Sequence, residues 1–193
     1  MGTARRLSGV LIPGDPIPSD GPIVFLAGPV SGCEPWRPEA RRLLHRSCSG
    51  VPIADPTPIP GAPRIADEVR VRWEFDAMVA AARRGCLVFW IPPQDRPMSM
   101  KLGYPKPYAA ATRFELGLWL GRRALDPGAR LVVGIDPTLA GGEYWTEQIG
   151  AAGDVKVLDS LDAVRLAACA ALRGPEVQKV QRVAPPGSSP STA

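Results

Sequence analysis

The sequence predicts an α/β protein with a doubly wound parallel sheet of about five strands and helices on both faces. Three continuous apolar runs, at residues 23–27, 86–91 and 131–135, are typical of buried strands in a parallel sheet. Stretches with helical periodicity separate them, and strands that alternate with helices favour this architecture. Ligands of such sheets bind at the carboxyl ends of the strands, so we expect the functional site there.

The remaining elements follow from apolar spacing and from turn residues. Helices are predicted at residues 36–46, 66–84, 113–123 and 161–172, short strands at 51–54 and 155–158, and a Gly-rich loop with at most a short helix at 137–153. Four prolines between residues 56 and 63 exclude helix and central strand there. The loop at 94–111 is unusually long for a compact α/β domain, which is typical of a functional lid.

The two ends of the chain lack apolar periodicity. Residues 1–21 are rich in Gly, Pro and Ser, and we expect them to form a flexible arm. Residues 174–193 are predicted to be a disordered tail for the same reason. The chain of 193 residues is long enough for one domain with a sizeable core, which we place at residues 22–173.

Composition and charge argue against several classes of protein. The 23 basic and 19 acidic residues give a net charge of +4 without a run of five like charges, so no nucleic-acid partner is expected. No apolar run of 18 residues or signal peptide is present, so we expect no membrane partner. The four cysteines are too sparse for a disulfide framework and lack the spacing of a metal site, which favours a reducing cytoplasm.

The turn after the first strand, residues 28–32, is the first candidate for ligand binding. It begins with Gly28 and Pro29, and small residues there let a ligand approach the backbone. Free N–H groups in such a turn can hold a phosphate or a sugar hydroxyl. A tight strand-to-loop turn explains the same residues. The glycine fingerprints of dinucleotide-binding and P-loop proteins do not occur in the sequence.

Asp76 is the second candidate. It is predicted to share an apolar helical face with Val69, Trp73 and Ala80. A carboxylate on such a face costs free energy unless it is paired or used in catalysis. Ion pairing with Arg72 or Arg83 would explain it structurally, so the spacing leaves both interpretations open.

Glu115 is the third candidate. Thr112 is predicted to cap the helix at 113–123, with Glu115 as its third residue in a capping-box pattern. The helix dipole would keep such a carboxylate ionised, and an ionised carboxylate can act as a nucleophile. An ordinary capping role fits the same position, and the pattern alone does not decide between the two.

Few other residues suggest chemistry. His45 is the only histidine, and without a GxSxG motif it argues against a Ser-His-Asp triad and a histidine metal site. Most of the five tryptophans are expected in the core. Trp36 and Trp90 lie beside the expected ligand edge, where an aromatic ring could stack on a nucleobase.

Four segments, taken together and in order, resemble the nucleoside 2-deoxyribosyltransferase-like family. They are residues 24–29, 71–78, 87–91 and 113–117, and the resemblance spans about residues 23–136. It implies a flavodoxin-like fold and cleavage of the N-glycosidic bond between a deoxyribose and a base. It also implies that Glu115, in the position of the family's ELG motif, is the nucleophile, that Asp76 works near the base or the sugar, and that Gly28 and Pro29 line the pocket.

The chain departs from well-known members of that family in two places. Those members carry a further Asp in a Gly-rich turn shortly before the nucleophile, whereas residues 108–113 contain no acid here. The loop at 94–111 is also longer than theirs. The role of the missing acid is therefore unassigned.

The resemblance implies a double displacement through a glycosyl ester on Glu115, with Asp76 protonating the leaving base. Two inversions retain the configuration at C1′, and no metal or redox cofactor is needed. The implied partner is a small nucleoside or nucleotide, and the residues expected to bind it besides Gly28 and Pro29 are Trp73, Trp90, Arg113 and Asp136. A homodimer or larger homo-oligomer is implied as well.

Three alternatives remain open. A hydrolase for nucleoside 5′-monophosphates would use the same residues, with water in place of the acceptor base and Arg113 or the amides of residues 30–32 on the phosphate. A nucleotide-binding module without turnover is favoured by the missing Asp. An NAD-dependent oxidoreductase is disfavoured because the glycine fingerprint is lacking.

Overall fold

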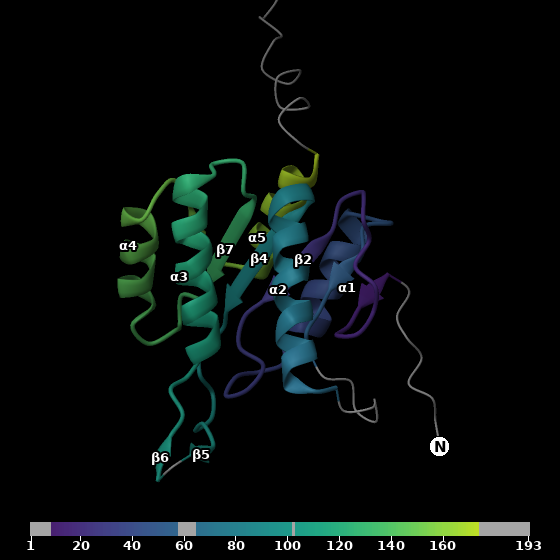
Figure 1. The fold of residues 1–193 in the computed structure, drawn as a ribbon. Coiled ribbons are helices and arrows are strands. Elements are labelled where there is room, and N and C mark those ends of the chain that lie inside the picture. Colours follow the sequence, from purple (N-terminus) through teal and green to yellow (C-terminus); the bar gives the residue numbers. More distant parts are fainter. Residues whose placement is uncertain (1–8, 58–64, 102, 174–193) are drawn as a thin grey trace, which may run out of the picture.

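A parallel sheet of six strands forms the centre of the computed structural model, which describes residues 9–57, 65–101 and 103–173. The strand order is β1-β3-β2-β4-β7-β8, and every neighbouring pair is parallel. Helices cover both faces, which confirms the predicted doubly wound, flavodoxin-like α/β architecture (Figure 1). The strands are β1 Val10–Leu11, β2 Val24–Ala27, β3 Ile53–Ala54, β4 Cys86–Ile91, β7 Leu131–Ile135 and β8 Val157–Leu158.

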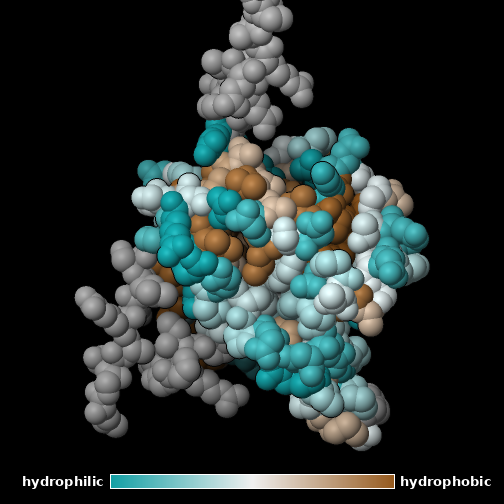
Figure 2. Space-filling model, turned by 180° about the vertical axis from the view of Figure 1, so that it is seen from behind, coloured by the Kyte–Doolittle hydropathy of each residue, from teal (hydrophilic) through white to brown (hydrophobic). Residues whose placement is uncertain are grey.

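Two layers of helices enclose this sheet. In Figure 1, α2 and α3 lie in front of it with α4 beside α3, whereas α1 and α5 lie behind it. On that rear side α5 packs against β4, β7 and α1. Figure 2 shows the rear face, where apolar areas occupy the upper part and the lower part is mostly hydrophilic. The helices are α1 Arg37–Ser47, α2 Asp67–Arg84, α3 Ala110–Leu125, α4 Gly142–Ala151 and α5 Leu161–Leu172.

The core consists mainly of the central strands and the helix faces that cover them. Every residue of β2 and β4 is buried, because these strands are covered on both faces. On the front, the rings of Phe25 and Trp73 pack with their centroids 6.5 Å apart. On the rear, Trp90 lies over Gly134 so closely that a Cβ there would collide with its ring and with Val164 of α5. The apolar runs therefore predicted the strands correctly.

The predicted flexible arm at residues 1–21 is wrong for its second half. Val10–Leu11 forms β1, which pairs with β3 at the edge of the sheet. Farther along the chain, Arg84 of α2 donates hydrogen bonds to the carbonyl oxygens of Gly21 and Pro18. A strand of two residues is too short to show an alternating pattern, so no periodicity in the sequence could predict it. Residues 1–8 and 174–193 lie outside the described part of the chain.

The predicted loop at 94–111 contains a hairpin. Strands β5 Met100–Lys101 and β6 Tyr104–Pro105 pair antiparallel and project from the lower end of the molecule, where the strands of the main sheet have their carboxyl ends (Figure 1). The base of this loop is anchored, since Arg96 Nη2 donates to the carbonyl oxygen of Cys33 at 2.7 Å and Tyr108 Oη donates to that of Pro92 at 2.7 Å.

Two of the four cysteines form a disulfide, contrary to the expectation from their spacing. Cys48, which follows α1, is bonded to Cys169 of α5, 121 residues later. The sequence could not show this pair, because only the packing of α1 against α5 brings the two residues together. Cys33 and Cys86 are free and buried. Among the described residues, no helix is both long and apolar enough to cross a membrane.

Candidate functional site

The candidate site lies where the strand order of the sheet reverses. After β2 the chain passes through α1 to β3, whereas after β4 it passes through α3 to β7 on the other side of the sheet. The carboxyl ends of β2 and β4 thus form the topological switch point, where ligands of open α/β sheets bind. The loops at residues 28–36 and 92–109 leave the sheet at this point.

Arg37, the first residue of α1, lies at the centre of this edge and is only 5% exposed. Its Nη2 donates to the carbonyl oxygen of Gly28 at 2.7 Å, and its Nη1 donates to that of Pro29 at 3.1 Å. Burial lowers the pKa of Arg37, but an arginine remains charged across the physiological range. The turn after β2 therefore holds a fixed positive charge, which the sequence analysis did not identify.

Asp55 fixes Arg37 from the other side. It follows β3, is 1% exposed, and lies with Oδ1 3.3 Å from Arg37 Nε and Oδ2 2.7 Å from Arg41 Nη1. The same Oδ1 accepts hydrogen bonds from the Thr57 amide at 2.9 Å and from its hydroxyl at 2.6 Å. A buried carboxyl group with this many partners has its hydrogen bonds satisfied, so it holds the two guanidinium groups in place.

Glu115 faces α2 from the side of α3. Burial, and after it the negative charge of Glu74, raise the pKa of its carboxyl to about 7, although Arg37 opposes the shift. At neutral pH this carboxyl therefore exchanges a proton readily, as a group in general acid–base or nucleophilic catalysis must.

The predicted capping role of Glu115 is wrong. α3 begins at Ala110, three residues earlier than expected, so Glu115 is its sixth residue. Thr112 is buried within the helix, and the N-cap residue is Ala109, whose φ of 54° lies in the left-handed region. The helix dipole acts mainly within the first turn, so it does not keep Glu115 ionised as predicted. Capping of α3 therefore does not explain why a carboxylate stands at position 115.

Glu74 of α2 is the second carboxyl of the site, and the sequence analysis missed it. Burial raises its pKa, while Arg70, with Nη1 3.8 Å from Glu74 Oε1, and Arg37 lower it. Glu74 lies one turn before Met78, on the side of α2 that contacts the core. The buried residues of α2 are Trp73, Ala77, Met78, Ala81 and Ala82. Their spacing, read from the sequence, would have placed Glu74 rather than Asp76 beside the core.

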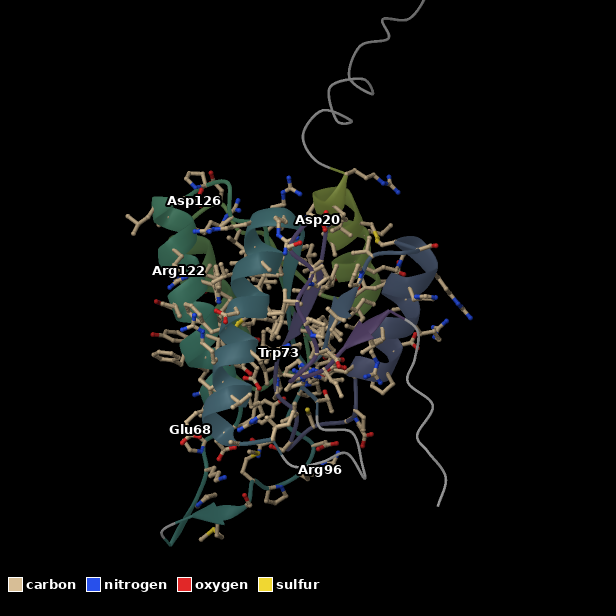
Figure 3. The ribbon with its side chains drawn as sticks, turned by 45° about the vertical axis from the view of Figure 1, so that its right-hand side comes forward. Asp20, Glu68, Trp73, Arg96, Arg122 and Asp126 are labelled. Carbon is tan, nitrogen blue, oxygen red and sulfur yellow. A yellow bond between two sulfur atoms is a disulfide. The ribbon has the colours of Figure 1, made fainter. Side chains whose placement is uncertain are left out.

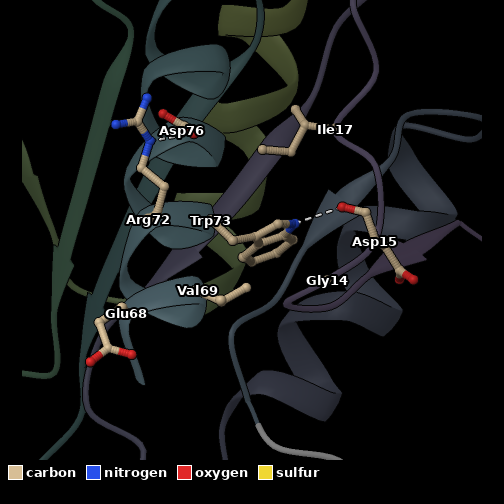
Figure 4. A pocket seen from close by; sticks show the side chains of 8 residues that line it. All are labelled: Gly14, Asp15, Ile17, Glu68, Val69, Arg72, Trp73 and Asp76. Carbon is tan, nitrogen blue, oxygen red and sulfur yellow. Dashed lines mark hydrogen bonds and ion pairs between the residues drawn. The ribbon is translucent and has the colours of Figure 1, made fainter. Parts of the chain in front are cut away.

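Asp76 lies away from this group of residues. Its side chain is 43% exposed, and Arg72 Nε donates to its Oδ2 at 2.8 Å. Asp76 and Trp73 line an open groove of about 500 Å³ between α2 and residues 14–17 (Figure 4). The expectation that Asp76 faces the core is wrong. Its ion pair with Arg72 is one of the two that would explain this carboxylate by structure alone.

The contacts of Trp73, next to the same groove, are explained by packing. Its indole Nε1 donates to the carbonyl oxygen of Asp15 at 2.8 Å, as the dashed line in Figure 4 marks. Its ring packs on Phe25 of β2. The structure thus places this predicted binding residue between the sheet and the segment after β1, and does not bring it together with Glu115.

Close packing explains why the turn after β2 begins with a glycine. Gly28 has a φ of +147°, and a Cβ there would collide with the carbonyl oxygen of Trp90 and the ring of Trp36. The carbonyl oxygen of Pro29 accepts a hydrogen bond from Trp36 Nε1 at 3.0 Å as well as from Arg37. Gly28 and Pro29 therefore lie at the site as predicted, where they bind Arg37 through their carbonyl groups.

The other predicted binding residues lie at three different places. Trp90 is 4% exposed and packs on the rear of the sheet. Arg113 places its guanidinium 4.7 Å from the ring centroid of Trp145, in a groove between α3 and α4. Asp136 accepts hydrogen bonds from the amide and hydroxyl of Thr138, at 2.9 and 2.6 Å, in the turn after β7. Only Asp136 lies at the carboxyl edge of the sheet with its side chain partly exposed.

The hairpin loop closes one side of the site. The Asp95 amide donates to the carbonyl oxygen of Gly32 at 2.9 Å, and a Cβ on Gly32 would collide with Met98. Burial also raises the pKa of the Cys33 thiol, which disfavours a reactive thiolate. The loop therefore packs on the turn after β2.

The two carboxyls of Glu115 and Glu74 and the guanidinium of Arg37 thus lie on three helices within electrostatic range of one another. No group of three or more His, Cys, Asp or Glu residues suited to a metal ion occurs in the described ranges 9–57, 65–101 and 103–173. No protein-family model matches the chain, and neither does any curated protein sequence.

Proposed function

We propose that the protein cleaves or transfers the N-glycosidic bond of a nucleoside or nucleotide through a glycosyl ester on Glu115, as its resemblance to the nucleoside 2-deoxyribosyltransferase-like family implies. The observation that supports this proposal is a protonatable carboxyl pair at the topological switch point. The charge of Glu74 raises the pKa of Glu115, and Arg37 lowers the pKa of both carboxyls. Two carboxyls with unequal environments are what glycoside chemistry requires.

In the proposed first step, ionised Glu115 attacks C1′ while the bond from C1′ to the base nitrogen breaks. The electron pair of that bond leaves with the base, which takes a proton from an acid. We assign the acid to Glu74 in place of Asp76, because burial favours its protonated form and Asp76 is paired with Arg72. In the reactive form Glu74 carries the proton and Glu115 is ionised.

In the second step an acceptor base or water attacks C1′, and the ester bond to Glu115 breaks. The electron pair returns to the Glu115 carboxylate, and the proton of the acceptor returns to Glu74. Arg37 stabilises the negative charge on Glu115 before and after the reaction, since its guanidinium is fixed by Asp55 and by the turn after β2. Two inversions retain the configuration at C1′.

A nucleoside 5′-monophosphate hydrolase is the second candidate. The observation that favours it is that the amides of residues 30–32 donate no hydrogen bond to any described part of the chain, so they are available for a phosphate. Arg113, the other group expected to hold the phosphate, stacks on Trp145 instead.

We place this activity in the cytoplasm, in a homodimer or larger homo-oligomer that needs no nucleic-acid or membrane partner. A reducing cytoplasm would open the disulfide between Cys48 and Cys169. Titration of free thiols in protein isolated under acid quench tests this location, since four thiols support the cytoplasm and two contradict it.

The experiment that tests the activity is incubation with deoxynucleosides and their 5′-monophosphates, with and without a free base, followed by chromatography. Base exchange supports a transferase, and free base from monophosphates alone supports the hydrolase. Glu115→Gln should fold and lose turnover, because an amide does not form the glycosyl ester. Glu147→Gln on the exposed face of α4 is the matched control and should keep full activity. A wild type that turns over none of these substrates refutes both activities and leaves a nucleotide-binding module.

A further inference from the structure

The outer face of α3 is apolar along its whole length. Within this helix, all of which the structure describes, Arg113 is the only exposed residue that carries a charge, and its guanidinium stacks on Trp145 of α4. The other exposed residues of α3 are alanines, glycines, Phe114 and Leu125. The solvent-facing side of a surface helix normally carries charged and polar residues, as the exposed side of α1 does. The outer face of α3 therefore has the composition of a covered surface.

The remaining charged residues of α3 lie on its flanks and are half-buried. They are Glu115, Arg122 and Arg123. The guanidinium of Arg122 lies 5.0 Å from the ring centroid of Phe75 on α2, so it points along the side of the helix. In Figure 3, Arg122 is labelled on the upper half of α3, at the left-hand edge of the view. None of these charges therefore lies on the outer face.

Large apolar side chains stand out from this part of the surface. Phe114 and Leu125, near the two ends of α3, are 74% and 89% exposed. On the helices to either side, Val71 of α2 and Tyr144 of α4 are also largely exposed. A single exposed apolar residue is common on any protein, but these four lie on three adjacent helices of the front layer (Figure 1). A group of this kind indicates a surface that binds another protein.

Two glycines lie between Phe114 and Leu125 on the same face. Glycine in the interior of a helix is destabilising relative to alanine. A Cβ at Gly117 or at Gly121 would meet no atom within 4 Å outside the helix, so packing within the chain does not require a glycine at either position. The distance between two packed helices depends on the side chains at their contact, and glycines allow a close approach.

We propose that this face of α3 is the interface of a homodimer, in which α3 packs antiparallel against α3 of a second copy about a two-fold axis. The order of side-chain sizes along the face favours a second copy, because it is the same from both ends: large Phe114, small Gly117 and Gly121, large Leu125. An antiparallel pair brings Phe114 against Leu125 of the partner subunit and Leu118 into the hollow at Gly121 of the partner subunit. An isologous interface requires this kind of self-complementary surface.

The front layer is large enough for a stable dimer. With about 1.5 Å of rise per residue and a width of about 10 Å, the 18, 16 and 10 residues of α2, α3 and α4 cover about 660 Å². A specific interface buries at least about 500 Å² on each partner. A single bound peptide helix would cover α3 and leave Val71 and Tyr144 exposed. The inference rests on the proposed function only for the homo-oligomer, whose interface it assigns, and it does not depend on the reaction at Glu115.

The oligomeric state of the full chain tests the proposal. Light scattering should give twice the 20.6 kDa of one copy. Gly121→Glu places a charge in the interface, and in sedimentation equilibrium it should raise the dimer Kd by about tenfold or more. Its far-UV circular dichroism should match that of the wild type, because the new side chain has open space within the chain and glutamate favours a helix more than glycine does.

The matched control is Gly150→Glu on α4. Gly150 is exposed, its Cβ would also meet no atom within 4 Å, and it does not line the groove between α3 and α4. This variant should keep the Kd of the wild type. A monomeric wild type overturns the proposal, and so does an equal loss of dimer in Gly150→Glu. A dimer that Gly121→Glu leaves intact refutes this interface but keeps the homo-oligomer of the proposed function.

A cross-link tests the register of the two helices. In the double variant Leu118→Cys/Gly121→Cys, oxidation with copper phenanthroline should join two copies through disulfides that a reductant opens. Gly150→Cys should give no cross-linked dimer. Should Gly121→Glu fail to fold, this cross-link still decides the matter, and its absence contradicts the antiparallel arrangement. Turnover of nucleosides is measured separately, so a failure of the proposed reaction is distinguished from a failure of the interface.

Discussion

The pH dependence of stability in Glu115→Gln gives the sharpest test of the site, and it needs no substrate. In the folded protein the pKa of Glu115 is about 7, against an ordinary value of 4.5. Between these pH values the folded state holds more protons than the unfolded state, so stability falls as pH rises from about 4.5 and levels off above about 7. A shift of about 2.5 pKa units corresponds to about 3.4 kcal/mol.

Glutamine cannot ionise, so Glu115→Gln escapes this loss. We expect the variant to match the wild type in stability near pH 5 and to exceed it by up to about 3 kcal/mol at pH 8. At roughly 2–4 °C per kcal/mol for a domain of this size, that is a rise in Tm of roughly 6–12 °C. Thermal unfolding from pH 5 to pH 8 measures it, with Glu147→Gln as the control.

Two outcomes would refute this reasoning. A Tm difference between Glu115→Gln and wild type that stays constant from pH 5 to pH 8 would show that the carboxyl titrates normally. A wild-type Tm that does not change from pH 5 to pH 8 would also show that this carboxyl titrates normally. Glu74→Gln should remove part of the effect, because the charge of Glu74 raises the pKa of Glu115.

Three further predictions follow from the positions of other residues. Glu74→Gln should lower kcat by about 10²–10⁴-fold, whereas Asp76→Asn should change kcat less than twofold. Steady-state kinetics on the substrate identified by chromatography measure both, and a larger loss in Asp76→Asn would contradict the assignment of the acid to Glu74. Cys48→Ser should destabilise the oxidised protein by about 5 kcal/mol, because the disulfide closes a loop of 121 residues; denaturant unfolding with and without reductant checks this, and equal midpoints would contradict it. Deletion of residues 1–20 should lower Tm because it removes β1 and the Asp15 carbonyl that binds Trp73, and an unchanged melting curve would show that this segment contributes nothing.

The order and type of the main elements could be predicted from the sequence, because they depend on local patterns. The runs at residues 86–91 and 131–135 became β4 and β7 with the same bounds, since a strand covered on both faces needs an unbroken apolar run. The helix at 161–172 was predicted with the same bounds, with Asp159 or Ser160 as its cap. Ser160 is the cap, and its Oγ accepts a hydrogen bond from the Ala163 amide at 3.3 Å. These features depend on neighbouring residues and not on contacts with distant parts of the chain.

Helix faces and boundaries were less determined by sequence. The start of α3 depends on Ala109 in the left-handed region, a conformation that an alanine adopts only because the surrounding structure holds it there. On α2 the exposed Val69 suggested a face that included Asp76, but the buried residues place Glu74 on the core side. Apolar residues on a helix surface are common, so a single valine does not define the buried stripe.

The sequence by itself determined a doubly wound parallel sheet and pointed to Glu115 at its carboxyl edge. Only the tertiary structure decided what surrounds that carboxyl: Glu74 from α2, Arg37 from α1, and Asp55 behind Arg37. The contact between Cys48 and Cys169 was decided in the same way. The physical reason is that a pKa and a long-range contact depend on desolvation and on charges brought together from distant parts of the chain, whereas apolar periodicity is a property of neighbouring residues.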